Sequence, residues 1–193
     1  MTVDPASFLA GLEQAQAGRP SALSPEETQA LQRGLQMREM AHRHQQYLEQ
    51  AQRNLEAGRA FLAKNAREPG VETLASGLQY RVVVEGAGPA PKETDAVTVH
   101  YRGTLVDGTP FDGSRERGSP ETIDVASAIP GWREALLRMK VGSQWELFVP
   151  TELAYGEEEM ARIPPNSALV FELELLAIEP ADPVAPPPGP GPD

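Results

Sequence analysis

The sequence predicts an α+β protein: an antiparallel half-barrel sheet wrapped on one short helix, preceded by a long N-terminal helical arm. Three observations predict this fold. Apolar residues keep helical spacing from Pro25 to Asn65, with no further proline between them. Runs with strand-like alternation follow the breaker Pro69-Gly70. One short helical pattern, residues 130–142, interrupts these runs.

Composition restricts the class of protein. Of the 193 residues 40% are hydrophobic and the formal net charge is −11, so nothing predicts nucleic-acid binding. No apolar run approaches the roughly 20 residues of a membrane-spanning helix. The first residues, MTVDPASFLAGLEQ, lack the pattern of a signal peptide. We therefore expect a cytoplasmic protein, or one of the periplasm or cell envelope if a leader has been removed.

Two helix starts stand in the first part of the chain. At Asp4 a capping residue precedes a proline, which predicts a short helix ending at Gly18. The second start is stronger, because Ser24 can cap, Pro25 suits the first helical position and Glu27 completes a capping box.

The long helix divides the chain. About 40 residues at 1.5 Å each reach about 60 Å, twice the width of a small domain, so much of the helix must lie outside a globular core. It is either a solvated spacer or a stalk or dimer contact, and the apolar residues from Leu31 to Met40 favour the second interpretation. We predict a helical stalk or dimerisation region (1–70), a core-bearing domain (71–180) and a disordered or polyproline II tail (181–193).

The strand-like runs are LQYRVVVEG, AVTVHYRGTLV, ETIDV, QWELFV and ALVFELELLAI. Their alternation predicts a sheet with one buried face, whose inward residues include Val97, Val99, Tyr101, Leu169, Phe171, Leu173 and Leu175. In the short helical pattern, Trp132, Leu136 and Met139 share a face, and Gly142 is placed to end the helix.

Some inward positions do not fit a simple core. Tyr101, Asp112, Arg117 and Tyr155 carry polar groups, and burying such groups without partners costs about 1–3 kcal/mol each. They imply either a local polar network or the mouth of an open pocket.

Other chemistries are disfavoured. Glu157–Glu159 is a run of carboxylates without the spacing of a cation site, and we interpret it as a solvated loop. The three histidines, His42, His44 and His100, do not form a ligand set. A glycosidase pair of Asp107 and Asp112 is weak, because Asp107 belongs to an Asp-Gly turn. We predict neither a metal nor a cofactor.

The motifs VHYRGTLVDGTPFDGS, IPGW, ELAYG and IPPNSALVFELELL, in this order, are together similar to those of the FKBP-type peptidyl-prolyl cis-trans isomerases. The resemblance extends from about Leu74 to Glu179. The long preceding helix and the segment GLQYRVVVEG further resemble the macrophage infectivity potentiator subgroup of bacterial isomerases. Members of this subgroup have an N-terminal helical region that forms a dimer.

The resemblance implies an isomerase that rotates X–Pro bonds without a covalent step, by desolvation in an aromatic pocket. Its partners would be proline-containing polypeptides, rapamycin- or tacrolimus-type macrolides and a second copy of the chain. The implied catalytic residues are Tyr101, Phe111, Asp112, Tyr155 and Phe171, and the implied substrate-binding residues are Ile129, Trp132, Ile163 and Arg117. Among these, Trp132 would be the floor, and the Ile129 N–H and the Tyr155 hydroxyl would hold the bound carbonyls.

The chain also departs from the family pattern. Glu121 stands where many members have an aromatic residue, which predicts a more open pocket, and Glu157–Glu159 predict that acidic substrates are disfavoured. Subgroup members usually have one more helix before the one predicted at Asp4. The alternative function is a non-catalytic chaperone or docking module that holds unfolded chains.

Overall fold

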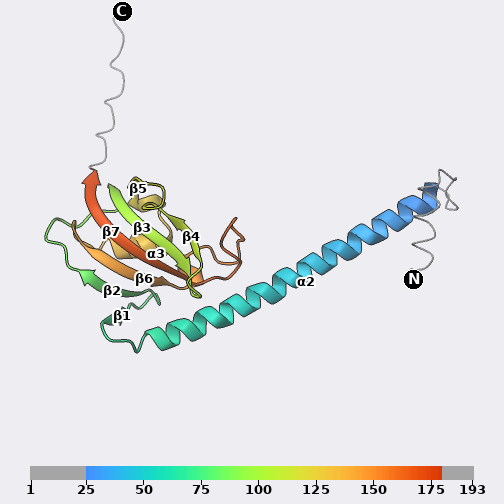
Figure 1. Ribbon diagram of the computed structural model, residues 1–193, viewed down its shortest axis with the longest axis horizontal. Coiled ribbons are helices and arrows are strands. Elements are labelled where there is room, and N and C mark those ends of the chain that lie inside the picture. Colours follow the sequence, from blue (N-terminus) through green and yellow to red (C-terminus); the bar gives the residue numbers. More distant parts are fainter. Residues whose placement is uncertain (1–24, 180–193) are drawn as a thin grey trace, which may run out of the picture. The chain divides into compact units, whose positions relative to one another are not determined.

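The computed structural model describes residues 25–179, coloured in Figure 1. The helix predicted at Asp4, the cap at Ser24 and the tail 181–193 lie outside this range. The elements are α2 (Pro25–Asn65), β1 (Val71–Thr73), β2 (Gln79–Val84), β3 (Ala96–Leu105), β4 (Pro110–Gly113), β5 (Glu121–Asp124), α3 (Pro130–Leu136), β6 (Gln144–Val149) and β7 (Leu169–Glu179).

The strands form one sheet in the order β1-β2-β6-β7-β3-β4, and β5 also pairs with β3. Every pairing is antiparallel, as predicted. In the longest one, β3 runs beside β7 from Ala96 opposite Glu179 to Leu105 opposite Leu169, with one bulge (Figure 1). The predicted alternation is confirmed, because residues 97, 99 and 101 of β3 are buried and their neighbours are not.

The buried face of the sheet packs on α3. Trp132, Ala135 and Leu136 of this helix belong to the same core cluster as the inward residues of β3, β6 and β7. The helix ends at Leu136 and not at Gly142, which corrects the predicted bound. The N–H groups of residues 138 and 139 both bond the Ala135 carbonyl, so the chain tightens into turns. Met139 is fully buried although it lies beyond the helix. Its apolar side chain therefore continued the helical spacing in the sequence past the real end of the helix.

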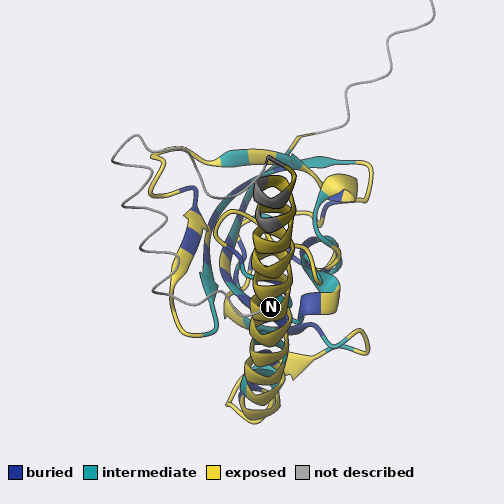
Figure 2. Cartoon of the chain, turned by 90° about the vertical axis from the view of Figure 1, so that its right-hand side faces the viewer, coloured by how far each residue is buried: buried dark blue, intermediate teal, exposed yellow. Residues whose placement is uncertain are grey.

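The predicted bounds of the long helix are confirmed at Pro25 and Asn65. Its turns up to Tyr47 belong to one compact unit, and the turns from Leu48 belong to the unit that contains the sheet. Figure 2 shows that α2 is exposed along most of its length. No helix within residues 25–179 has the length and apolar character needed to cross a membrane. The division predicted at residue 70 stays a prediction.

One face of the last turns of α2 packs on the domain. The ring centroid of Phe61 lies 6.0 Å from that of Phe148 in β6. The buried Asn65 amide donates to Gln79 Oε1 at 2.9 Å, and Gln79 Nε2 donates to the Leu62 carbonyl at 3.0 Å. Two side-chain hydrogen bonds of Gln79 therefore join this end of the helix to β2.

We predict that Gln79→Leu lowers the free energy of unfolding by about 1–3 kcal/mol, because it leaves the buried Asn65 side-chain amide without its acceptor. Urea denaturation measures the loss. Gln52→Leu on the exposed face of the same helix is the control and should change stability by no more than about 0.5 kcal/mol. Equal losses of unfolding free energy in both variants would contradict a stabilising role for the Gln79 hydrogen bonds.

Candidate active site

A cleft of about 290 Å³ opens beside α3. It is lined by Tyr101, Phe111, Asp112, Glu121, Ile123, Ser127, Ala128, Ile129, Trp132, Tyr155 and Phe171. These residues come from β3, the β3–β4 hairpin, β5 and the turn after it, the start of α3, the segment after β6, and β7. We call it the aromatic cleft, because rings supply its core-facing wall.

The rings pack edge to face. Trp132 meets Tyr101 and Phe171 with centroid distances of 5.1 Å each and interplanar angles of 79° and 81°. Phe111 meets Phe171 at 5.6 Å and 89°. Such contacts add about 0.5–1.5 kcal/mol each beyond the burial of area, so they stabilise the wall of rings. The buried indole N–H of Trp132 finds no acceptor among residues 25–179.

A glycine lets the rings approach the sheet. Gly103 of β3 pairs with Phe171 on one side and with Asp112 on the other. A Cβ on Gly103 would lie 2.5 Å from Phe111 Cζ, which no side chain can accept. Our sequence reasoning missed this residue, although glycine inside a strand run is a signal of close approach.

A polar network borders the rings. The Tyr101 hydroxyl donates to Asp112 Oδ2 at 2.6 Å, and Arg117 pairs with Asp112 and donates to the same hydroxyl at 2.9 Å. Arg117 also pairs with Glu121, whose carboxylate lies 3.2 Å from the Tyr101 oxygen. The polar network is thus two carboxylates that share one guanidinium and one hydroxyl.

The protonation states follow from these contacts. Burial and the hydrogen bond to Asp112 raise the pKa of Tyr101 far above its ordinary value, against the smaller influence of Arg117. Burial acts to raise the pKa of Asp112, but the Tyr101 and Gly113 donors and the Arg117 charge together hold it below its ordinary value. Burial raises the pKa of Tyr155. At neutral pH the tyrosines therefore keep their protons and Asp112 is a charged acceptor.

The structure brings most of the predicted site residues together. Tyr101, Phe111, Asp112, Ile129, Trp132, Tyr155 and Phe171 line the aromatic cleft, and Arg117 lines an adjoining hollow of about 260 Å³. Ile163 is buried in the core cluster and is not among the residues that line the cleft. Sequence reasoning did not identify Ile123, Ser127 or Ala128 as lining residues. Ser127 and Ala128 are small side chains in a turn, and Ile123 lies in the four-residue strand β5, which is too short for a clear periodic signal.

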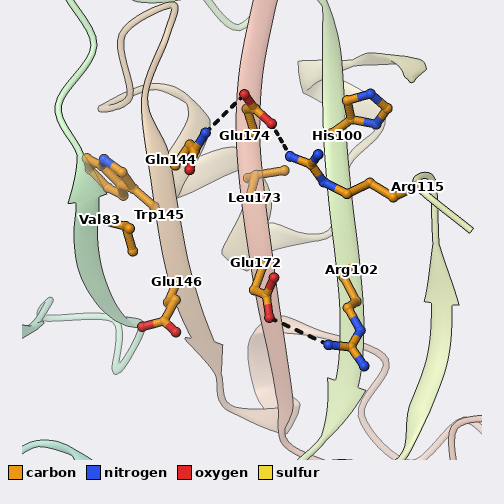
Figure 3. A pocket seen from close by; sticks show the side chains of 10 residues that line it. All are labelled: Val83, His100, Arg102, Arg115, Gln144, Trp145, Glu146, Glu172, Leu173 and Glu174. Carbon is orange, nitrogen blue, oxygen red and sulfur yellow. Dashed lines mark hydrogen bonds and ion pairs between the residues drawn. The ribbon is translucent and has the colours of Figure 1, made fainter. Parts of the chain in front are cut away.

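A further hollow of about 180 Å³ lies on the solvent-facing side of the sheet (Figure 3). Its charged side chains satisfy one another: Arg115 and Gln144 both bind Glu174, and Arg102 lies 3.8 Å from Glu172. The aromatic cleft is the stronger candidate, because it joins a wall of four packed rings to the polar network.

Comparisons with known proteins agree with the geometry. Residues 88–176 match the family described as FKBP-type peptidyl-prolyl cis-trans isomerase, and residues 1–82 match the domain amino terminal to FKBP-type peptidyl-prolyl isomerase. The chain is 39% identical to the outer membrane protein MIP of Legionella longbeachae, over 93% of this chain and 77% of that protein. It is 45% identical to the FKBP-type 22 kDa peptidyl-prolyl cis-trans isomerase of Escherichia coli K12, over 90% and 83%. The crystal structure of FkpA from Escherichia coli superposes with a TM-score of 0.84 at 40% identity, covering 94% of this chain and 84% of that one.

The lowered pKa of Asp112 predicts a pH dependence of stability. Because the folded-state pKa lies below the unfolded one, the stabilisation is complete above roughly pH 4 and is lost as the pH falls through the folded-state pKa. The difference in unfolding free energy between wild type and Asp112→Asn should stay constant from about pH 7 to pH 5 and shrink below about pH 4. Urea denaturation across this range measures it, and a difference that grows on acidification would refute the assignment.

Proposed function

The chain belongs to the FKBP-type peptidyl-prolyl cis-trans isomerases, and on this basis we propose that it rotates X–Pro bonds of polypeptides in the aromatic cleft. The observation that carries the proposal is a ring-walled cleft of about 290 Å³ beside a carboxylate held in its charged form. A pyrrolidine ring is apolar and fits such a wall, while the peptide on either side needs polar partners at the rim.

The mechanism we propose needs no covalent step. Amide resonance holds the barrier to rotation at about 18–20 kcal/mol, and water bound to the carbonyl strengthens that resonance. The twisted amide has less charge separation than the planar one, so a cleft that excludes water favours the transition state. A reduction of the barrier by about 4 kcal/mol accelerates rotation roughly a thousandfold.

Each group then has a role in the proposal. Trp132 supports the proline ring from below, and the Ile129 N–H and the Tyr155 hydroxyl donate to the bound carbonyls. Asp112 is a positioned acceptor and not a general base, because its lowered pKa makes it a weak base. Arg117 holds that carboxylate, and Ile163 supports the wall from the core.

Two finer proposals concern assembly and ligand binding. We propose a homodimer through the helical region 1–70, since Leu35, Met37 and Met40 on α2 are 51%, 72% and 64% exposed. We also propose that rapamycin- or tacrolimus-type macrolides compete with proline peptides for the aromatic cleft. Sedimentation and inhibition of peptide turnover test these proposals.

For location, we propose the periplasm or cell envelope, since the relative from Legionella longbeachae is named an outer membrane protein. Cell fractionation decides between this and the cytoplasm.

We predict that Asp112→Asn and Phe171→Leu each lower kcat/KM on a short Ala-Pro peptide by about tenfold or more, because each removes one interaction worth about 1.4 kcal/mol or more. NMR exchange spectroscopy or a protease-coupled assay measures the rate. Asp124→Asn, an exposed carboxylate outside the cleft, is the control. Exchange at the solvent rate with the wild-type protein contradicts the proposal. Suppression of aggregation that survives Asp112→Asn but requires α2 would favour the holding function instead.

The rim of the cleft predicts a charge preference. One guanidinium faces both Asp112 and Glu121, and Glu158 and Glu159 are exposed on the loop that follows Tyr155. We expect peptides with Lys before proline to be turned over about three- to tenfold faster than peptides with Glu, and added salt should reduce the difference. Equal kcat/KM values for the two peptides at low salt would exclude this preference.

A further inference from the structure

The last turns of α2 contact the loop that follows the cleft residue Tyr155. Asn54 Nδ2 donates to the Pro165 carbonyl at 2.8 Å, across 111 positions of sequence. One turn further along, a Cβ on Gly58 would lie 2.9 Å from the Cβ of Ala168. The helix thus touches the last part of the segment 156–168, at Pro165 and at Ala168.

This loop, residues 156–168, is held beside the cleft at its first residue, Gly156. The Asn166 N–H donates to the Gly156 carbonyl at 2.8 Å, and Thr151 Oγ1 donates to the same carbonyl at 3.2 Å. Gly156 directly follows Tyr155, which lines the cleft. The carbonyl that Asn54 holds and the N–H that bonds Gly156 therefore belong to the same peptide group, between Pro165 and Asn166.

The loop has bonds of its own between Met160 and Ile163 and from Ser167 Oγ to the Pro164 carbonyl, but Pro165 is held differently. Pro164 and Pro165 have no N–H to donate, so sheet-type bonds cannot order them. Pro165 is fully buried, and its carbonyl would lose its partner without Asn54. Asn166 adopts a left-handed backbone with φ 56°, a conformation that its surroundings must stabilise.

We propose that Asn54 and Gly58 of α2 are positioning residues of the isomerase cleft. The helix holds loop 156–168 through the Pro165 carbonyl and through close packing on Ala168, and the loop in turn holds Tyr155 in place. This inference rests on the proposed function for its effect on turnover. The helical region then orders the substrate site directly, in addition to any part in assembly.

The test uses the full chain with Asn54→Asp, which keeps the size of the side chain and replaces the donor by an oxygen facing a carbonyl. We expect KM for an Ala-Pro peptide to rise about three- to tenfold while kcat changes less than about twofold. The reason is that Tyr155 is held less firmly in the variant, which weakens substrate binding. Hydrogen exchange of the Asn166 amide should accelerate about tenfold, while the amides of β6 and β7 keep their protection.

Two variants separate positioning from stability. Asn65→Asp is the matched control, because it breaks a buried helix-to-sheet bond of the same chemistry far from the loop. It should lower stability and leave KM and Asn166 exchange unchanged. Gly58→Ala should raise KM although alanine favours the helix more than glycine does.

The outcomes are distinct. If Asn54→Asp and Asn65→Asp affect KM and Asn166 exchange equally, or if Asn54→Asp affects neither, the inference is overturned. If the wild-type protein does not accelerate isomerisation, the proposed function fails, and faster Asn166 exchange in Asn54→Asp alone still establishes the helix-to-loop contact.

Discussion

The aromatic cleft depends on a single register between β3 and β7. Because side chains alternate between the two faces, a slip of one residue would put Tyr101 and Phe171 on opposite faces of the sheet. The register also sets Gly103 between Phe171 and Asp112, so that the Phe111 ring can cross the strand where no Cβ obstructs it. The wall and the carboxylate of the site therefore come from one pairing, and the position of each is determined by the position of the other.

The polar network uses that placement. A tyrosine hydroxyl and an ionised carboxylate at the edge of an apolar wall would be costly without partners, and Arg117 supplies the missing charge. The cost of this arrangement is a second carboxylate, Glu121, which competes for the same guanidinium. Since one cation faces two anions, the rim keeps a negative charge, and this charge is the basis of the preference that we propose for substrate peptides.

Local patterns were sufficient to predict much of the fold and site. Alternation in β3 and β7 predicted the buried face, and the run from Pro25 to Asn65 predicted α2. Most cleft residues came from the resemblance to the FKBP family. The four-residue strand β4 was too short for a periodic signal, although its turn was recognised. The contact of Asn54 with Pro165 could not be predicted, because the two residues are distant in sequence and asparagine on a helix carries no preference for a partner.

The packed turns of α2 also bear on its exposed turns. Helix nucleation is unfavourable and propagation is nearly neutral, so residues 48–65, held by the domain, supply the nucleus from which the helix extends. Beyond them, the pair Glu39–Arg43 contributes only a few tenths of a kcal/mol, and Gly34 weakens the helix by about 1 kcal/mol relative to alanine. The helical and unfolded states of the exposed turns are thus close in free energy. A surface that covers Leu35 and Met40 would shift this equilibrium toward the helix. Assembly through this region would therefore draw on the same packing that orders the loop beside the cleft.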